Sequence, residues 1–456
     1  MNVTRAKIFT AALFLSLAVV QGGASRAADQ GPVGQTSGVG EVVLSGDGSW
    51  GYNGPHAVIG DGKLLSTYID AKGVIRAVCY QLESGEMTSG EVAESYADLH
   101  QASSLFVRPD GRVQVFVNKR GVYTDEKIFW KVGAEPGSVA AFGQLQESKD
   151  AGIAQGRHFY PLVHRRTGDV YLILNAADGG RRRIGMWKST DGGDTFDEYH
   201  LLYGLADDLR GNRSYTRAYL QGDDIHLVAV RVGWNEPLAG QNIGRIEGLY
   251  YIRYNIGERA FYHADGGHAF GLEEAPVYDT RHFDEIWNWK NDGDMRHRVL
   301  WADIVAADGQ PYVAFTVQAA VPQGESALHD GYWATPNEHG QWQSHKVATL
   351  ARGWDNRPER VNYAIAIDPQ SPNTVFVSKS TDQACDLSRV HRMVTRDGGA
   401  TWVSEQVLSS EGRITTLVVP QVIDQKPRSI EVLWLEGRIE GWRDYATKIM
   451  MRRARR

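Results

Sequence analysis

The sequence predicts an all-β protein, a seven-bladed β-propeller with Asp-box turns. Three observations predict it: a composition with 50 Gly, 20 Tyr and 13 Trp in 456 residues, a hairpin pattern that recurs along the chain, and a turn motif found twice between hairpins. Glycine-rich turns between aromatic and β-branched strands are typical of antiparallel sheets. Helical bundles and fibrous architectures are therefore excluded.

Residues 1–27 have the features of an export signal. Two basic residues precede an apolar run from Ile8 to Val20, and the small residues Ser25 and Ala27 suit cleavage by a signal peptidase. The run is too short to cross a bilayer. We expect a periplasmic or secreted protein without membrane contact, in which residues 28–456 form a single propeller domain.

The charge balance and the cysteines argue against nucleic-acid-binding, membrane-binding and disulfide-stabilised proteins. The chain has 49 basic and 55 acidic residues, a net charge of -6, so nothing global attracts nucleic acid or anionic lipid. Cys79 and Cys385 could pair after export, but cysteines in separate parts of a large core are more often buried thiols. We expect a monomer that disulfides do not hold together.

A hairpin of two apolar strands around a polar turn recurs seven times. The turns fall near residues 61, 110, 168, 222, 308, 371 and 425. Without the signal, 456 minus 27 leaves 429 residues, or about 61 for each of seven repeats, somewhat above the spacing usual for propeller blades. Further apolar strands between the hairpins would complete each blade outwards.

Two of the connecting turns carry the Asp-box pattern, at Ser189 to Phe196 and at Thr395 to Trp402. In such a turn the carboxylate accepts hydrogen bonds from the turn, glycine supplies the unusual backbone angles and the aromatic residue packs between strands. We therefore interpret Asp191 and Asp397 as structural rather than catalytic.

The interval between the turns at 222 and 308 is longer than the others and rich in His, Asp, Trp and Arg. It could form the rim of a binding cleft or cover the side of a blade. Whether the protein holds a structural calcium or zinc ion stays open. The candidate ligands fall in this interval but match no known ligand spacing; they are His263, Asp265, His268 and His282.

Equivalent positions of the inner strands converge at one mouth of a propeller channel. Five to ten residues before each turn, the sequence places His and Tyr where other repeats have small or apolar residues, and Arg and Lys lie close by. We predict a pocket for an acidic ligand there. Its candidate members are His56, His100, Tyr160, Tyr215, a position around Arg298 to Trp301, Tyr363 and Thr415, with Arg157, Arg213, Arg217, Arg357, Arg360, Lys119 and Arg120 nearby.

The residue types indicate a class of reaction. Glycoside hydrolysis normally needs two carboxylates, and no pair of Asp or Glu occupies the matched strand starts. Elimination at a uronic acid instead needs a group that neutralises the sugar carboxylate, a base for the C5 proton and an acid for the leaving oxygen. Arg, His and Tyr supply these functions without a cofactor.

Several stretches together resemble the BNR-repeat family. They are Asp98 to Leu105, Pro109 to Arg112, His158 to Pro161, Ser189 to Phe196, Ser214 to Arg217, Gly248 to Tyr251, Trp301 to Ile304, Val432 to Trp434 and Arg443 to Tyr445. Within that family the chain is similar to seven-bladed propeller lyases that act on rhamnose-glucuronate linkages, ulvan lyases among them.

The resemblance implies roles for individual residues. It places an aspartate-histidine motif on Asp98 to His100, which makes His100 a proton-transfer residue, and it assigns Tyr160 and Tyr215 to the catalytic site with Arg217 two residues on. Together with the residues chosen from their places near the strand starts, the expected substrate-binding residues are Arg217, Arg213, Lys119, Arg157, His56 and Tyr363. The sequence departs from the ulvan lyase pattern at Asn118, where some relatives have a second histidine.

We therefore predict a polysaccharide lyase that cleaves a uronate-containing glycan, with the rhamnosyl-α-1,4-glucuronate bond as the expected linkage. The substrate would be an acidic polysaccharide or oligosaccharide. Two alternatives stay open: a glycan-binding propeller without catalysis and a sialidase-like glycoside hydrolase. The sequence does not decide which of His100, Tyr160 and Tyr215 is base and which is acid, nor between endo and exo cleavage.

Overall fold

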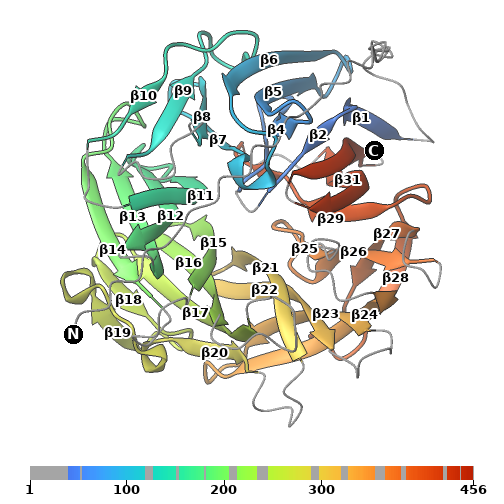
Figure 1. The fold of residues 1–456 in the computed structure, drawn as a ribbon. Helices are drawn as coiled ribbons and strands as arrows, with labels where there is room; N and C mark the ends of the chain where they lie inside the picture. The colour runs from blue at the N-terminus through green and yellow to red at the C-terminus, as the bar shows by residue number, and fades with distance from the viewer. Residues whose placement is uncertain are drawn as a thin grey trace, which may run out of the picture. The chain divides into compact units, whose positions relative to one another are not determined.

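The structure is a computed structural model in which the strands surround a central axis as the seven blades of a β-propeller, shown in Figure 1. The predicted fold class is therefore confirmed. The predicted signal at residues 1–27 lies outside the described part of the chain. That part comprises residues 40–51, 54–118, 127–149, 154–178, 181–204, 213–233, 245–288, 297–319, 327–354, 365–381, 387–424, 429–441 and 443–454.

The first three blades follow one another along the chain, each as an antiparallel meander that runs outwards from the axis. Blade one contains β3 (Ala57–Gly60), β4 (Lys63–Asp70), β5 (Val74–Gln81) and β6 (Met87–Glu94), with β2 (Gly48–Ser49) paired to β4. Blade two contains β7 (Ser104–Val107), β8 (Val113–Val117), β9 (Phe129–Val132) and β10 (Gln146–Glu147). Blade three contains β11 (Ala154–Val163), β12 (Val170–Asp178), β13 (Arg181–Ser189) and β14 (Glu198–Tyr203).

Blades four to six continue the same pattern. Blade four contains β15 (Arg213–Gln221), β16 (Asp224–Gly233), β17 (Arg245–Asn255), β18 (Ala260–Tyr262), β19 (His268–Gly271) and β20 (Asp284–Trp287). Blade five contains β21 (His297–Ala307), β22 (Gln310–Ala319), β23 (Ala327–Pro336) and β24 (Trp342–Trp354). Blade six contains β25 (Ile365–Ile367), β26 (Thr374–Ser380), β27 (Ser388–Val394) and β28 (Val403–Val407).

Blade seven combines both ends of the described chain. Its strands are β29 (Ile414–Val418), β31 (Ile430–Gly441), β32 (Asp444–Arg453) and, on the outside, β1 (Glu41–Ser45). The short β30 (Gln421–Val422) leaves this blade and pairs in parallel with β3. Three 3₁₀ helices occur among the described residues: η1 (Leu99–Gln101), η2 (Leu272–Glu274) and η3 (Thr280–His282). The described part of the chain contains no helix with the length and apolar character that a membrane crossing requires.

The predicted hairpins are the two innermost strands of the blades. The turns expected near 61, 110, 168, 222, 308 and 371 each connect a first to a second strand. The seventh, near 425, falls in residues outside the described range, between β29 and β31. Most residues of β4 are buried, since an inner strand is covered by neighbouring blades on both faces.

The two Asp-box turns have the same hydrogen bonds. In the first, the backbone N–H and the hydroxyl of Thr195 donate to Asp191 at 2.9 and 2.6 Å, and Phe196 packs edge-on against Trp130. In the second, Thr401 donates to Asp397 at 2.8 and 2.6 Å. Each aspartate is thus occupied by its own turn, as expected for an architectural residue.

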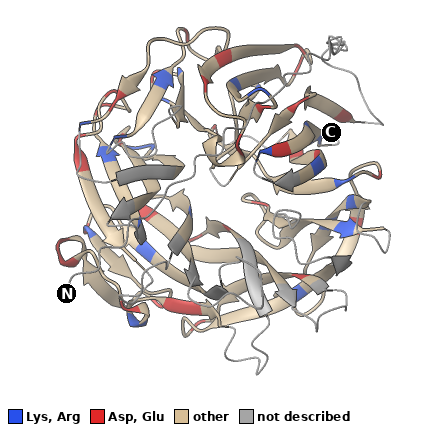
Figure 2. Ribbon diagram, in the orientation of Figure 1, with Lys and Arg blue, Asp and Glu red and all other residues tan. Residues whose placement is uncertain are grey.

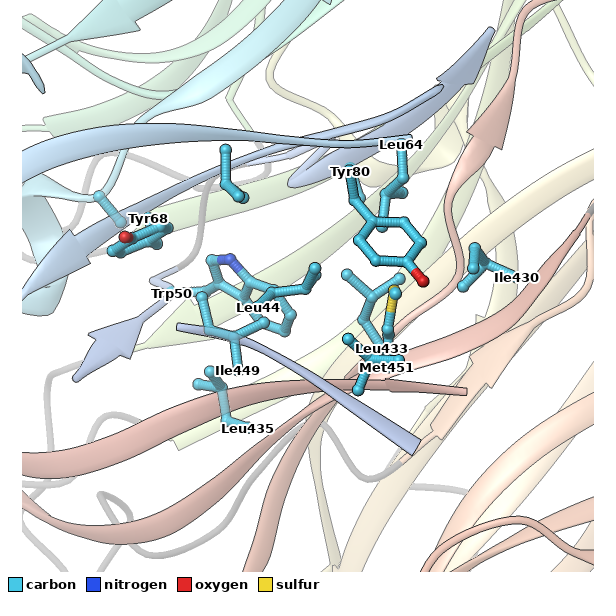
Figure 3. Packing of buried hydrophobic residues seen from close by; sticks show 14 of the residues in the cluster. Leu44, Trp50, Leu64, Tyr68, Tyr80, Ile430, Leu433, Leu435, Ile449 and Met451 are labelled. Atoms are coloured by element: carbon cyan, nitrogen blue, oxygen red, sulfur yellow. The ribbon is translucent and has the colours of Figure 1, made fainter. Parts of the chain in front are cut away.

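Ring closure depends on β1, which pairs antiparallel with β32 and places Val42 opposite Met451. The same region contains a core cluster between blades seven and one, in which Leu44, Trp50 and Leu433 lie close together (Figure 3). The hydroxyl of Tyr445 also donates to the carbonyl of Asp70 at 2.8 Å. Backbone pairing and apolar burial therefore hold the first and last blades together.

The long interval after β17 lies at the outside of blade four. β17 pairs with β18 near one end and with β20 near the other, so two short strands replace a single outer strand. Of the two interpretations, covering the side of a blade fits the described residues as far as 288. In this region the ring Nδ1 of His263 lies 2.8 Å from Oδ1 of Asp284. Among the described residues no group of three or more His, Cys, Asp or Glu side chains is arranged to hold a metal ion.

Leu433→Ala should weaken ring closure. Leu433 is fully buried between blades seven and one, and removing a buried leucine side chain costs about 3 kcal/mol of unfolding free energy. Urea unfolding of the variant should show a lower midpoint than the parent protein. Val403→Ala is the control, because Val403 is 60% exposed on β28 and its truncation should cost less than about 0.5 kcal/mol. Equal losses in both variants would contradict the assignment.

Candidate functional site

A pocket that is partly open to solvent lies on the axis of the propeller. Its lining comes from the inner strands of blades one, three, four, five, six and seven and from the residues that precede or follow them. The polar members are His56, Tyr160, Arg217, Tyr219, Asp303 and Gln421. The apolar members are Pro55, Ala218, Ile304, Val305, Ile365, Ile367, Pro369, Leu417, Val418 and Val419.

The pocket has a charged end near the strand starts. His56, Arg217 and Asp303 each lie five residues before the turn of their blade. The more apolar residues Val305 and Ile367 lie nearer the turns. Acidic and basic residues are otherwise interspersed around the ring (Figure 2), so the local site rather than a charged face can select an acidic ligand.

Arg217 carries the one guanidinium or ammonium group among the described residues that line the pocket. Its guanidinium carbon lies 5.1 Å from the centre of the Tyr160 ring, a cation–π distance. The strand alternation of β15 puts Tyr215, Arg217 and Tyr219 on one side of the strand. An arginine that is stacked on an aromatic ring is already held in place, and this suits it to bind a carboxylate in a fixed orientation.

His56 lies beside this cation and is 1% exposed. Its ring stacks on Trp50 with 5.4 Å between ring centres, and neither imidazole nitrogen has a hydrogen-bond partner of good geometry among the described residues. Burial and the charge of Arg217 lower the pKa of His56 to about 3. His56 is thus a neutral imidazole with unused hydrogen-bonding capacity, which a ligand could use.

Tyr160 reaches the pocket through an irregular stretch of β11. The register of β11 against β12 shifts between Arg157 and Tyr160, and His158 within this bulge has a φ of 56°. Positive φ at a residue other than glycine is uncommon and is found disproportionately at functional sites. His158 is buried, and its ring lies 5.6 Å from that of Tyr215. Burial raises the pKa of Tyr160 well above its usual value, so the phenol keeps its proton at neutral pH.

Asp303 is the single carboxylate among the described residues that line the pocket. One of its oxygens accepts the backbone N–H of Ile367 at 3.1 Å. Burial raises the pKa of Asp303, while Arg217 and the backbone hydrogen bonds act in the opposite direction. With one carboxylate, this pocket differs from the two-carboxylate arrangement of most glycoside hydrolases.

His100 lies on η1, just before the inner strand of blade two, and outside the lining of the pocket. In Figure 1 this short cyan helix is found next to β7, at the inner end of its blade. The Nδ1 of His100 is 2.7 Å from Asp98 Oδ1. The side-chain amide of Asn118 donates to the carbonyl oxygen of His100 at 3.2 Å, so the residue that departs from the ulvan lyase pattern lies beside this histidine.

The segment before β3 connects η1 with the pocket. A Cβ on Gly51 would lie 1.9 Å from the carbonyl oxygen of Leu99, so this position needs glycine. A Cβ on Gly54 would lie 2.6 Å from Arg217 Nη1 and would displace that side chain. The N–H of Gly54 donates to the carbonyl of Phe159 at 3.1 Å. Since Pro55 and His56 follow directly, this one segment contacts η1, β11 and β15.

The other predicted site residues have different positions. Tyr215 lies outside the pocket lining and contacts His158. Arg157 and Arg213 belong to β11 and β15, but their side chains lie outside the described part of the structure, as do Lys119 and Tyr363 entirely. The buried Cys79 is a free thiol, and Cys385 lies outside the described residues.

The members of the site that were predicted from the sequence do not include Asp303. In blade five the predicted inward position is around Arg298 to Trp301, whereas Asp303 faces the pocket. The register of β21 shifts between Val299 and Trp301, so alternation counted from the strand start does not hold beyond that point. His56 lies five residues before its own turn. The same distance counted back from the turn at 308 leads to Asp303.

Comparison with known proteins gives a match of fold. One solved structure, described as a polysaccharide lyase PL25 ulvan lyase bound to -[GlcA(1-4)Rha3S]-, has a TM-score of 0.66 and 14% identity and covers 89% of this chain and 94% of its own. A second structure of a PL25 ulvan lyase has a TM-score of 0.65 and 15% identity and covers 90% and 95%. No family model and no curated protein matches the sequence.

His56 should make the protein sensitive to acid. A histidine whose pKa is 6.5 when unfolded and about 3 when folded binds a proton in the unfolded state first, so stability is complete above pH 6.5 and falls as the pH drops towards 3. The loss is on the order of 4 kcal/mol across that window. Urea unfolding at pH 7 and pH 4 should show a smaller pH effect in His56→Gln than in the parent protein. An unchanged pH effect would argue against a buried neutral imidazole.

Proposed function

We propose that the protein is a polysaccharide lyase that cleaves a uronate-containing glycan by β-elimination, at a rhamnosyl-α-1,4-glucuronate linkage. The observation that carries the proposal is the charged end of the axial pocket, where Arg217 stacks on the protonated Tyr160 beside the neutral, buried His56. The predicted export signal would bring such an enzyme to extracellular or periplasmic polymers.

Arg217 has the chemistry to bind the uronate carboxylate. Its positive charge would offset the negative charge of the substrate and stabilise the charge that develops when C5 loses its proton. The cation–π contact with Tyr160 fixes the guanidinium, and the neighbouring His56 can add a hydrogen bond without adding charge. Gly54 packs against Arg217 and Tyr160, and Gly51, three residues earlier, packs against Leu99 of η1.

Two residues can carry the proton transfers. We assign His100 as the base that takes the C5 proton and Tyr160 as the acid that protonates the leaving oxygen, because a phenol with a raised pKa is a poor base but still holds a proton to give. The electron pair of the C5–H bond becomes the C4–C5 double bond while the C4–O bond breaks. The base gains the proton, the acid loses one, and no water is consumed.

The similar fold of the ulvan lyases supports the choice of substrate. One of them is described as bound to -[GlcA(1-4)Rha3S]-, a glucuronate-containing unit, and its fold covers 89% of this chain. The single carboxylate in the described pocket disfavours the hydrolase alternative. A glycan-binding propeller without catalysis would use the same pocket, and an assay for reaction products distinguishes it from a lyase.

Turnover should appear as a new absorbance. β-Elimination at a uronate creates a double bond conjugated with the carboxylate, so incubation with ulvan, gum arabic or a bacterial rhamnose-glucuronate polymer should raise the ultraviolet absorbance and yield an unsaturated product by mass spectrometry. Reducing ends formed without this absorbance would indicate hydrolysis. Binding to a polymer without any product would indicate the glycan-binding alternative.

Arg217→Met should weaken substrate binding and should affect KM more than kcat. Loss of a hydrogen-bonded charge pair with the substrate carboxylate should raise KM by roughly 10-fold to 100-fold. Arg166→Met is the matched control, because Arg166 is exposed at the β11–β12 turn, where it pairs with Asp223 at 2.7 Å, and should leave KM unchanged. Equal effects of the two variants would remove Arg217 from the binding site.

Tyr160→Phe should lower kcat by roughly 100-fold, since the ring and its packing stay while the transferable proton is lost. The thermal midpoint should change little, and this separates chemistry from folding. A substrate with a good leaving group needs no acid, so its cleavage by Tyr160→Phe should be close to that of the parent enzyme. A variant that is slow on both substrates would contradict the role of acid.

A further inference from the structure

Asp98 joins His100 to an arginine from the other end of the chain. Its Oδ1 accepts the backbone N–H of His100 at 3.0 Å and lies 2.7 Å from the ring Nδ1 of the same residue. Its Oδ2 accepts the Nε–H of Arg443 at 2.9 Å. Both carboxylate oxygens therefore have strong donors, and Asp98 itself is buried.

Arg443 comes from a part of the propeller distant from Asp98 and His100, which are neighbours on and before η1. Asp98 caps η1 in front of blade two, and Arg443 lies in the turn between β31 and β32 of blade seven. Leu99 belongs to the same buried cluster as residues of blades one and seven. The arrangement is thus assembled only when the ring is closed.

The contacts define the state of each group. Hydrogen bonds from His100 and Arg443 hold the pKa of Asp98 well below its usual range, although burial acts in the opposite direction. An ionised carboxylate only accepts hydrogen bonds, so the Nδ1 of His100 carries its proton towards Asp98. Any proton that His100 exchanges with a substrate must then pass through Nε2.

We propose that Asp98 and Arg443 are positioning residues of the elimination: Asp98 fixes the ring orientation and tautomer of His100, and Arg443 fixes Asp98. This inference rests on the proposed function, in which His100 is the base. As the base takes the C5 proton on Nε2 it becomes an imidazolium, and the adjacent carboxylate of Asp98 stabilises that charge. No atom other than this proton is transferred to His100.

A purely structural role is the alternative, because Asp98 also caps η1. Asp110 offers a matched control. It lies in the same blade, accepts the backbone N–H of Arg112 two residues on at 3.0 Å and pairs with the guanidinium of that residue. Asp110 therefore has the local contacts of Asp98 but no histidine and no place near the pocket.

The first experiment reads the tautomer without substrate. In ¹⁵N-histidine-labelled full-length protein, the His100 signal, identified by its loss in His100→Gln, should show a protonated Nδ1 and an unprotonated Nε2. In Asp98→Ala the signal should shift towards a mixture of tautomers. A proton on Nε2 in the parent protein would overturn the proposal, whatever the enzyme does to glycans.

The second experiment uses kinetics on the polymer that the parent enzyme cleaves. Asp98→Ala should lower kcat by on the order of 100-fold with KM nearly unchanged, because a base that is no longer held in its reactive orientation transfers the proton about that much more slowly. Asp98→Asn keeps an acceptor but loses the charge and should fall between Asp98→Ala and the parent. Arg443→Met should cost up to about fivefold, because Arg443 is 71% exposed and its ion pair is weak.

The control and the outcomes separate the two proposals. Asp110→Asn should leave kcat unchanged. Asp98→Ala with full kcat, in an enzyme that needs His100, would overturn the positioning role and leave the lyase proposal intact. If the parent protein cleaves no uronate polymer, the proposed function fails, and the tautomer measurement alone decides whether Asp98 orients His100. Should Asp98→Ala not fold, Arg443→Met provides the kinetic test, since its side chain is exposed.

Discussion

The backbone pairing of β1 with β32 is the constraint on which the rest of the structure depends. It brings the first described strand into the last blade and closes the ring, so every inner strand is flanked by neighbours. The axial pocket exists because inner strands from blades one and three to seven meet at the same place. The contact between Asp98 and Arg443 depends on the same closure, because the two residues are 345 positions apart.

The pocket concentrates polar groups where the fold would otherwise favour apolar ones. Burying His56 without good hydrogen bonds and Asp303 beside Arg217 costs free energy, and the apolar clusters between the blades offset that cost. A buried polar group that lacks a partner in the free protein can gain one when a ligand binds. His56 could gain such a partner from the substrate that we propose.

The fold was largely predictable, and the site was predictable in part. Each hairpin is a local feature, so its apolar alternation and its turn residues appear directly in the sequence. His56 and Tyr160 were found by their distance from the turns and Arg217 by its place two residues after Tyr215, and the structure brings these three into one pocket. Asp303 was missed because a bulge in β21 interrupts the count from the strand start. The long interval after β17 could not be placed, since sequence does not say on which side of a blade an insertion packs.

By itself the sequence determined the all-β class, the number of repeats, the Asp-box turns and three of the polar residues that line the pocket. These depend on periodicity, turn chemistry and composition, which are properties of neighbouring residues. Only the tertiary structure decided that Arg443 holds Asp98 and that Asp303 and Arg217 line the same pocket. Such contacts join residues from separate blades, and their geometry follows from ring closure and strand register rather than from any local pattern.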